Sequence, residues 1–346
     1  MQPRPTQKRI SCRSAQNDSS KEKGDAYAPC VSCESGFRKA DASLTLVPRI
    51  VEACAAAGVD YEIALTEYPG HGARLARQWA ETGEPVRLYA CGGDGTFNEV
   101  LRGAMGWANA AVGCVPCGSG NDFIRNYGTA EQFLNLDAQL NGSEQAIDLM
   151  ETSAGLCASI CAAGLDAQVA YGIPKFRRLP FCGGSMAYKL SIVQNVCGPL
   201  GHRLAIQMDD EQLEEDCLMV AICNGSCYGG GFCAAPQASL QDGLLDVIVV
   251  RKVSRLRIAK VISLYKTGAH LKNGQVVPEL ADVILYRQAR QVRLNCLDGQ
   301  PIVATVDGEC APRQELNVRV LPLAGRILLP RGAAARQSAA STAAVQ

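Results

Sequence analysis

Two glycine-rich segments contain the residue types that hold phosphate groups. The first, CGGDGTFNEV at residues 91–100, joins an apolar run to an amphipathic stretch with Phe97 and Val100 on one face. Its glycines permit a tight turn with accessible backbone N–H groups, and the N-terminus of a following helix adds positive partial charge. The carboxylate of Asp94 can hold a magnesium-bound water. The segment therefore predicts a phosphate site, with a purely structural turn as the alternative.

The second segment, PCGSGNDF at residues 116–123, repeats this chemistry after the next apolar run. Its small residues allow a ligand to approach closely, Ser119 has a hydroxyl group for a phosphate, and Asp122 offers another oxygen ligand. An Asx-capped turn is the alternative interpretation. Two such loops after adjacent strands are hard to explain as unrelated turns, because ligands on parallel sheets bind beyond the carboxyl ends of the strands.

The elements that must position these loops alternate between helix and strand. The expected elements are helices at 44–57, 73–80 and 96–105, and strands at 61–65, 86–91 and 110–115. Strands and helices that alternate at this spacing predict a parallel, doubly wound sheet. The two glycine-rich loops would then follow two of its strands.

The sequence after Asp148 is mostly strand. Strands are expected at 156–162, 202–208, 217–223, 244–250, 283–286, 292–295, 302–306, 316–320 and 327–329, and helices only at 186–196 and 255–270. This pattern predicts an antiparallel second domain, most consistent with a β-sandwich. The expected organisation is an irregular N-terminal arm at 1–43, an α/β domain at 44–147, a β-rich domain at 148–330 and a disordered tail at 331–346.

The composition argues against some classes of function. The 34 Lys and Arg residues balance the 34 Asp and Glu residues, so the basic field typical of nucleic-acid binding is missing and no nucleic-acid partner is expected. No segment approaches the roughly 20 apolar residues of a membrane span, and the polar N-terminus does not resemble a signal peptide, so we expect a cytoplasmic protein. The 17 cysteines are scattered through apolar runs and are expected to act as small core residues.

GGDGTFNEV followed by GSGNDF resembles the diacylglycerol kinase catalytic domain, which bacterial lipid kinases share with sphingosine and ceramide kinases. The resemblance runs in order from about Tyr61 to Pro330 and is highly specific. Further matching segments are Ala146–Leu149, Gly164–Asp166, Asn224–Gly225, Tyr228–Phe232, Ala235–Pro236, Ser239–Val247 and Val306–Glu309. It implies an N-terminal α/β domain like that of NAD kinase and diacylglycerol kinase, with a C-terminal antiparallel β-sandwich that binds the lipid.

The resemblance also implies roles for individual residues. Those implied to contact ATP are Thr66, Gly92, Gly93, Asp94, Gly95, Thr96, Phe97, Asn98, Gly118, Ser119, Asn121 and Asp122. Those implied to form an aspartate, water and Mg²⁺ network are Asp94, Asp122 and Asp148, together with Glu309. A second, structural Mg²⁺ would bind Asp242 and the backbone oxygens of Ser239 and Leu244, although Asp-Gly at this point can be a simple turn.

The implied reaction is transfer of the γ-phosphoryl group of ATP to a lipid hydroxyl, with diacylglycerol as the expected acceptor, which would give phosphatidic acid. Either Asp307 or Glu309 would act as the general base, with Asp94 also catalytic. By itself the Asp307-Gly308-Glu309 tripeptide could be only a hairpin turn. The sequence does not distinguish the two carboxylates, and it does not identify the lipid.

Two alternatives to this activity stay open. Family members usually begin with a strand and an Asn-Pro turn that holds the nucleotide, but residues 27–36 contain only a Ser-Gly. This departure sustains a lipid-binding pseudokinase without turnover. A soluble-metabolite kinase of the NAD kinase type also shares the GGDGT loop, although the GSGNDF loop favours the lipid kinases.

One segment mixes positive charges with apolar residues, KFRRLPF at residues 175–181. This composition suits an anionic membrane surface, and a solvated loop is the alternative. A lipid substrate at the membrane surface in any case requires peripheral contact, which would be with the inner face of the membrane. The sequence leaves a homodimer open.

Overall fold

A computed structural model describes residues 9–12, 30–33, 40–118, 120–179 and 185–335. It divides the chain into two compact units. The first contains the chain up to Ile147 and again from Leu323, and the second contains Asp148–Pro322. The chain crosses between them within two strands, β6 (Ser143–Thr152) and β18 (Glu315–Leu329). Within these ranges no helix is long and apolar enough to cross a membrane.

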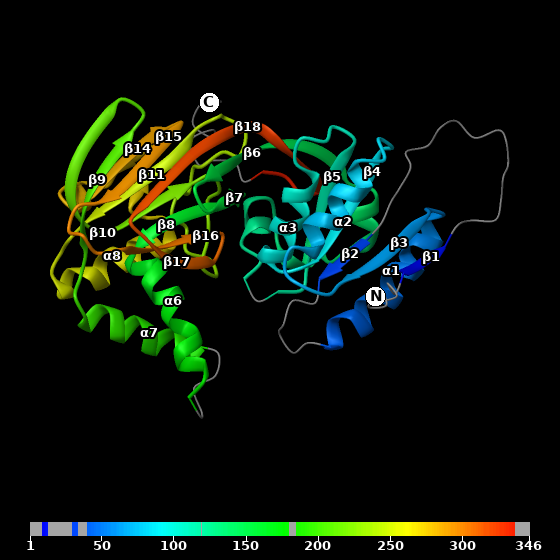
Figure 1. The fold of residues 1–346 in the computed structure, drawn as a ribbon, viewed down its shortest axis with the longest axis horizontal. Helices are drawn as coiled ribbons and strands as arrows, with labels where there is room; N and C mark the ends of the chain where they lie inside the picture. Colours follow the sequence, from blue (N-terminus) through cyan, green and yellow to red (C-terminus); the bar gives the residue numbers. More distant parts are fainter. Residues whose placement is uncertain (1–8, 13–29, 34–39, 119, 180–184, 336–346) are drawn as a thin grey trace, which may run out of the picture. The chain divides into compact units, whose positions relative to one another are not determined.

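The first unit contains a mainly parallel sheet (Figure 1). Its strand order is β1 (Arg9–Cys12), β3 (Tyr61–Thr66), β2 (Cys30–Cys33), β4 (Val86–Gly92), β5 (Ala110–Pro116) and the end of β18. Only β1 runs antiparallel to its neighbour. Strands β4 and β5 are almost entirely buried, as the continuous apolar runs of a sheet covered on both faces require.

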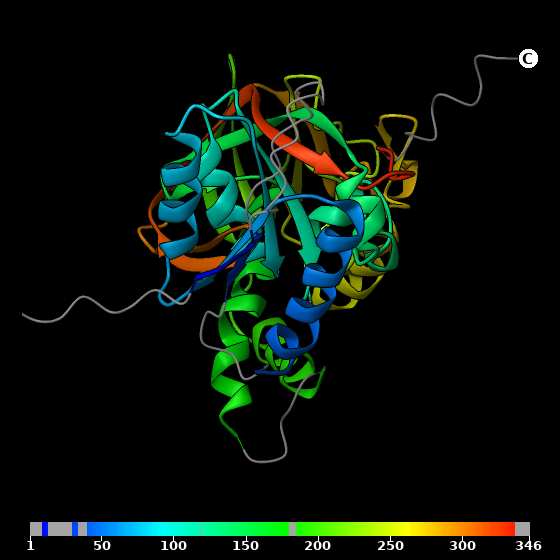
Figure 2. The ribbon, with the colours of Figure 1, turned by 90° about the vertical axis from the view of Figure 1, so that its right-hand side faces the viewer.

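Helices cover both faces of this sheet (Figure 2). Leu46, Ile50 and Cys54 of α1 (Ala40–Ala57) pack against strand residues that include Ile63 and Val115. On the other face lie α2 (His71–Ala80) and α3 (Asp94–Ala104). Three short helices follow β5, η1 (Phe123–Asn126), α4 (Ala130–Phe133) and α5 (Leu136–Leu140). The unit is therefore doubly wound, as expected.

Two expected boundaries differ from the structure. Strands β1 and β2 lie inside the segment 1–43, for which an irregular arm was expected, and β2 pairs in parallel with both β3 and β4. A four-residue strand is too short to show a hydrophobic period, so its place in the sheet is visible only through its neighbours. At the other end, Ile327 and Leu328 pair with β5, so the last residues expected in the second domain belong to the first unit.

The second unit is antiparallel in every strand pair whose register is described. Its strands are β6 from Asp148, β7 (Gly155–Cys157), β8 (Ile160–Gly164), β9 (His202–Met208), β10 (Glu211–Cys223), β11 (Leu245–Arg251), β12 (Leu271–Lys272), β13 (Gln275–Val276), β14 (Ile284–Ala289), β15 (Gln291–Cys296), β16 (Ile302–Val306), β17 (Glu309–Arg313) and the first part of β18. The long strand β10 is central, because its first half pairs with β9 and its second half with β8 and β11.

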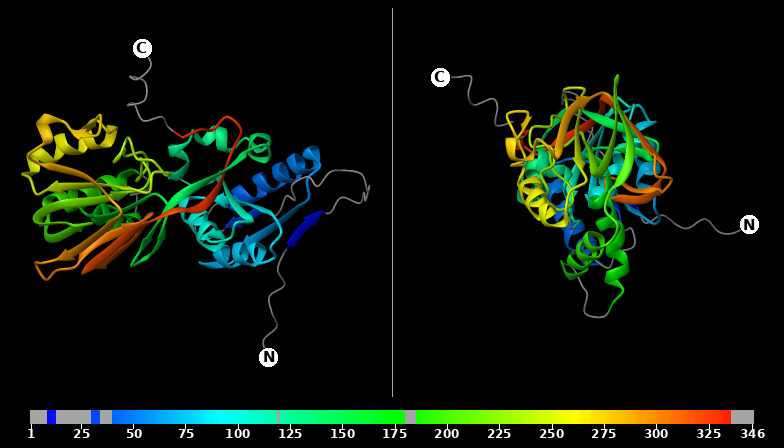
Figure 3. Two further views of the ribbon diagram at one scale, coloured as in Figure 1. Left: turned by 90° about the horizontal axis from the view of Figure 1, so that it is seen from above. Right: turned by 90° about the vertical axis from the view of Figure 1, so that its left-hand side faces the viewer.

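Two apolar cores lie on opposite faces of β10. Val220 and Ile222 belong to one buried cluster, whereas Ala221 and Cys223 belong to the other. This alternation is the period of two that a strand imposes on its side chains. The second cluster also contains residues of α6 (Leu165–Arg177) and α8 (Arg255–Thr267). The remaining helices are α7 (Ser185–Cys197) and the short η2 (Pro278–Leu280), and α6 and α7 extend away from the strands of this unit (Figure 3).

Candidate functional site

The first glycine-rich loop leads from the end of β4 into the N-terminus of α3. No side chain caps this helix at Gly93, and a methyl group added to Gly95 would meet no atom within 4 Å. A methyl group at Gly92 would instead lie 2.2 Å from Thr96 Oγ1, so this position requires glycine. An uncapped helix N-terminus with open space above its first turn is suited to an anionic group.

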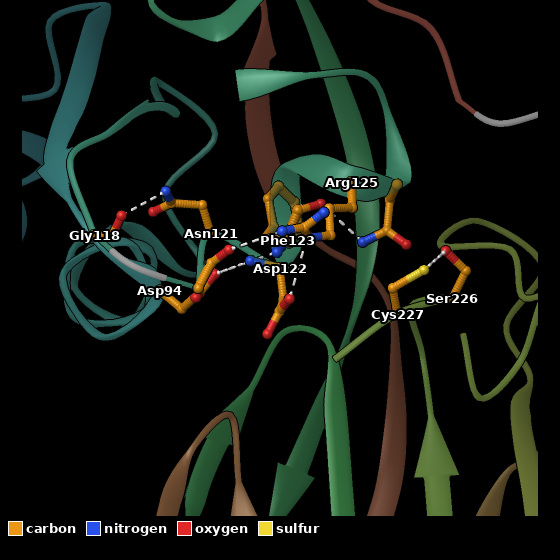
Figure 4. A network of polar contacts seen from close by, with 10 residues as sticks. Asp94, Gly118, Asn121, Asp122, Phe123, Arg125, Ser226 and Cys227 are labelled. Carbon is orange, nitrogen blue, oxygen red and sulfur yellow. Dashed lines mark hydrogen bonds and ion pairs between the residues drawn. The ribbon is translucent and has the colours of Figure 1, made fainter. Parts of the chain in front are cut away.

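The second loop packs directly against the first (Figure 4). Cys117 N donates to Gly92 O over 2.8 Å, and a methyl group at Gly118 would lie 2.5 Å from the Cα atom of Gly93. Asp94 Oδ1 accepts hydrogen bonds from the backbone N–H groups of Asp122 (2.7 Å) and Phe123 (3.2 Å). The two predicted loops are therefore one structure, and Asp94 holds it together.

Two other predicted nucleotide contacts have a buried polar atom without a hydrogen-bond partner among the described residues. They are Thr66 Oγ1, at the end of β3, and Asn121 Oδ1. Asn121 adopts a positive φ of 52° and donates to Gly118 O over 2.9 Å, which orients its amide group. Unsatisfied buried polar atoms are rare in native proteins. The Thr66 hydroxyl and the open helix N-terminus can donate to an anionic group such as a phosphate, whereas Asn121 Oδ1 accepts and fits a donor group, such as a hydroxyl or an amine of a nucleotide.

Some of the predicted nucleotide contacts do not have a group that can face a ligand. The Phe97 side chain is buried against the ring of Phe123, with the centroids 4.2 Å apart, so it packs in the core. Thr96 is buried next to Gly92, and Asn98 is half-buried on the same helix. Ser119 lies outside the described residues. The motif thus combines groups that can face a ligand with groups that hold the helix in place.

Glu99 is a site residue that the sequence did not reveal. Its carboxylate accepts hydrogen bonds from the backbone N–H groups of Gly70 (2.8 Å) and Gly72 (3.2 Å), at the start of α2. Glu99 therefore fixes α2, and the chain that follows Thr66, to the helix that begins at the first glycine-rich loop. The sequence signal for this contact is the Gly-x-Gly at residues 70–72, where α2 begins, and it is weak.

In the second unit, the predicted catalytic turn joins β16 to β17. Asp307 and Gly308 both have positive φ, 44° and 93°, and Val306 pairs with Glu309, as in a two-residue hairpin. The Asp307 carboxylate accepts hydrogen bonds from the backbone N–H groups of Ala158 (2.5 Å), Ser159 (3.0 Å) and Ile160 (3.0 Å). Glu309 is exposed. Asp307 therefore anchors the turn, and Glu309 is the better candidate for the base.

A second acidic turn lies in the same unit. Asp148 is fully buried, and its Oδ2 accepts a hydrogen bond from Gly243 N over 2.7 Å. Asp242 Oδ1 accepts one from Leu244 N over 3.0 Å, and Ser239 Oγ accepts one from Gln241 N over 3.3 Å. Partial desolvation, and to a smaller extent the negative charge of Asp148, raise the pKa of Asp242. Neighbouring negative charges of this kind favour a bound cation.

The side chains do not form a ready metal cluster. Across the described ranges, no group of three or more His, Cys, Asp or Glu side chains is arranged to hold a metal ion. Of the predicted network, Asp94 and Asp122 belong to the first unit, whereas Asp148 and Glu309 belong to the second. A site at Asp242 would depend on backbone oxygens, as the resemblance implied.

A partly buried acid lies at the start of α6, a helix that contacts both strands of the Asp307 hairpin. Gly164 ends β8 with a φ of 113°, where a methyl group would lie 2.5 Å from Leu218 O, and α6 begins directly after it. Asp166, in the first turn of α6, accepts a 2.5 Å hydrogen bond from the Tyr228 hydroxyl. Burial raises the pKa of the Asp166 carboxyl, and the hydrogen bond from Tyr228 opposes this change. Desolvation, and to a smaller extent the negative charge of Asp166, raise the pKa of Cys310, next to Glu309.

The chain is similar to known lipid kinases over most of its length. The diacylglycerol kinase catalytic domain model matches residues 33–152, and the model of the YegS C-terminal NAD kinase beta sandwich-like domain matches residues 159–329. A relative from Chromohalobacter salexigens, named "Probable lipid kinase YegS-like", is 29% identical over 80% of this chain and 86% of its own length. The diacylglycerol kinase of Bacillus subtilis is 25% identical over 62% of this chain and 70% of its own length.

Solved structures confirm the expected fold class. The crystal structure of a diacylglycerol kinase from Bacillus anthracis str. Sterne has a TM-score of 0.63 to this chain at 17% identity. Another structure from that organism has a TM-score of 0.66 at 20% identity, and each comparison covers 89% of this chain and 98% of the other. The predicted α/β domain and the predicted antiparallel sandwich are thus both confirmed.

Proposed function

Because the chain belongs to the diacylglycerol kinase catalytic-domain family, we propose that it transfers the γ-phosphoryl group of ATP to the hydroxyl group of a lipid, with diacylglycerol as the preferred acceptor. The observation that carries the proposal is the joined pair of glycine-rich loops at the uncapped N-terminus of α3. Relatives named diacylglycerol kinase support the choice of acceptor.

The first unit binds the nucleotide. The backbone N–H groups at the start of α3 hold the phosphate oxygens, and the helix adds positive partial charge. Thr66 Oγ1 and Asn121 Oδ1, which lack partners among the described residues, supply further polar contacts to ATP. Because Glu99 and Asp94 already hold these segments in place, little reorganisation accompanies binding.

The second unit supplies the proton acceptor. Glu309 takes the proton from the lipid hydroxyl while the oxygen of that hydroxyl forms a bond to the γ-phosphorus. The bond between the γ-phosphorus and the oxygen that bridges it to the β-phosphorus breaks, and ADP leaves. Asp307 keeps the hairpin in the conformation that presents Glu309. No covalent intermediate with the protein is needed.

Mg²⁺ is the cofactor proposed beside ATP. Carboxylate and carbonyl oxygens are the ligands that it prefers, and the residues that would hold it are Asp94 and Asp122 at the phosphates, with Asp242 and the backbone oxygens of Ser239 and Leu244 at a structural site. When bound, it would neutralise phosphate charge. Desolvation is the main cause of the raised pKa of Asp242, and the charge of Asp148 adds a smaller repulsion, which a cation at the second position would relieve.

The test is transfer of labelled γ-phosphate from ATP to a panel of micellar acceptors that contains diacylglycerol and a sphingoid base, with NAD as a soluble acceptor. We expect label on diacylglycerol, and none above background with the Glu309→Gln protein. Label on NAD alone would replace the proposal by a soluble-metabolite kinase. A folded wild-type protein that binds ATP without labelling any acceptor would indicate a pseudokinase.

A further inference from the structure

The helix pair α6 and α7 exposes an unusual share of the apolar surface. Eight large apolar side chains are exposed among the described residues, and four of them belong to this pair and its immediate end. They are Tyr171 (52% exposed), Leu179 (50%), Met186 (49%) and Val193 (58%). Single exposed apolar residues are ordinary, but a concentration on one small element marks an interaction surface.

Spacing places these residues on helix faces that also have positive charges. Tyr171, Lys175 and Arg178 follow one another at i, i+4 and i+7, and Arg178 still has helical backbone angles at the end of α6. On α7, Met186, Lys189 and Val193 lie at i, i+3 and i+7. Residues at these intervals share one face of a helix. Each helix therefore has a face that combines exposed apolar and cationic side chains.

The inner faces of the same helices are tightly packed. Ser191 is fully buried and donates to Val169 O over 2.6 Å, and a methyl group at Gly172 would lie 2.5 Å from Ser191 Oγ. Asn195 Nδ2 donates to Ser191 O, and Lys175 Nζ donates to Gln194 Oε1 over 3.5 Å. The two helices thus form a defined pair, which extends away from the strands of its unit (Figures 1 and 3). None of the four exposed apolar side chains takes part in these contacts.

The charges of the pair are not neutralised locally. Lys175, Arg177, Arg178 and Lys189 are exposed, and none of them forms an ion pair with any other described residue. On the strands of the same unit, by contrast, Arg203, Arg251, Arg287 and Arg319 each pair with a carboxylate. The only acid on α6 and α7 is Asp166, whereas the whole chain has a net charge of zero. Positive charge is therefore concentrated where apolar side chains are exposed.

We infer that the exposed face of α6 and α7 docks on an anionic lipid surface. Apolar side chains at this face enter the boundary between head groups and acyl chains, while the surrounding cations bind lipid phosphates. The inference deepens the proposed function, because it assigns the means by which the protein reaches a membrane-bound acceptor. A protein partner would have to offer acids and apolar groups side by side at matching positions, whereas an anionic lipid surface supplies both without a specific sequence.

The experiment is co-sedimentation of the whole protein with phosphatidylcholine vesicles that contain or lack phosphatidylglycerol, without ATP. Each reversed cation removes about 1 kcal/mol of attraction or more, so Lys175→Glu with Arg178→Glu should weaken binding to anionic vesicles at least about 30-fold. The matched control is Lys272→Glu with Arg290→Glu, two exposed cations of the same unit with the same change in charge. It should weaken binding only a few-fold.

The apolar component is tested by Met186→Ser with Val193→Ser, against Leu297→Ser as an equally exposed control residue. The helix variant should lose binding, and the control should keep it. Equal losses in the helix and control variants, or wild-type binding that does not depend on phosphatidylglycerol, would overturn the inference.

A second measurement separates this inference from the proposed activity. Phosphorylation of a water-soluble short-chain diacylglycerol should be retained by the Lys175→Glu, Arg178→Glu protein, while phosphorylation of long-chain diacylglycerol in vesicles falls. A wild-type protein that sediments with anionic vesicles but phosphorylates neither lipid would refute the kinase proposal and leave the docking surface intact. Equal loss of activity on both lipids would count against docking as the function of this face.

Discussion

The glycine-rich loops of the first unit and the Asp307 turn of the second are stabilised in the same way, but they present different groups to a ligand. In both, an aspartate accepts hydrogen bonds from backbone N–H groups of a segment distant in sequence, two for Asp94 and three for Asp307. In the glycine-rich loops, the groups that remain to face a ligand are backbone N–H groups, so the positions around them must be glycine, which has no side chain to block the ligand. In the Asp307 turn, the group presented is one side chain, Glu309. The identity of a residue as aspartate therefore does not reveal whether its carboxylate reacts or only positions the backbone.

The largest expected effect distinguishes the two acids of the turn at residues 307–309. Glu309→Gln removes a proton acceptor and leaves the hairpin unchanged, so kcat should fall about 10²- to 10⁴-fold. Nucleotide affinity and the urea midpoint should stay at wild-type values. Steady-state kinetics and urea unfolding of one preparation provide the check, and a variant with nearly normal kcat would remove Glu309 from the role of base.

Asp307→Asn should act on stability instead. An amide cannot accept three hydrogen bonds as a carboxylate does, and a buried N–H without an acceptor costs about 1–3 kcal/mol. We therefore expect a lower free energy of unfolding by that amount. If the Asp307→Asn protein unfolds like the wild type and loses activity as Glu309→Gln does, then Asp307 takes part in the chemistry. The distinction between a positioning Asp307 and a reacting Glu309 would then be wrong.

Two glycines of the first unit provide a matched pair. Gly118→Ala places a methyl group 2.5 Å from Gly93 Cα and should destabilise the joined loops by about 1–3 kcal/mol. Gly95→Ala meets no atom within 4 Å and should preserve or slightly raise stability. Its methyl group would nevertheless occupy the space above the helix N-terminus, so ATP affinity should fall about tenfold, a loss of about 1.4 kcal/mol. Calorimetric titration with ATP measures this, and undiminished affinity would place the phosphates elsewhere.

The smallest expected effect concerns pH. Burial raises the pKa of Asp166 in the folded protein above its unfolded value, so its contribution to stability is complete below about pH 4 and is lost as pH rises from there. Asp166→Asn does not titrate. The free energy of unfolding of this variant, measured relative to wild type, should therefore increase from about pH 4 toward neutrality. A difference that is independent of pH in urea titrations would show that Asp166 has an ordinary pKa.

Tyr228→Phe sharpens this test. The Tyr228 hydroxyl donates to Asp166 and lowers its pKa, against the effect of burial. Its removal should raise the pKa of Asp166 further and steepen the loss of stability with pH. A gentler slope in this variant would mean that the hydrogen bond favours the protonated acid.

The sequence by itself determined the α/β order, the antiparallel second domain and the two glycine-rich loops that follow neighbouring strands. Continuous apolar runs, alternating patterns and glycine-rich turns are local properties, and they can be read without knowing what packs against them. Their residue types also indicated the acidic turns at Asp242 and Asp307. These predictions depended on spacing within one segment.

Only the tertiary structure decided the roles that depend on distant partners. The place of β2 between β3 and β4, the clamp of Glu99 on Gly70 and Gly72, and the burial of Phe97 against Phe123 each join residues that are far apart in the chain. The distinction between Asp307 and Glu309 arose in the same way, from three N–H groups about 150 positions away. Spacing along the chain indicates which residues can share a face of a helix or strand. Contacts across the fold determine which carboxylate is hydrogen-bonded to backbone N–H groups and which is exposed.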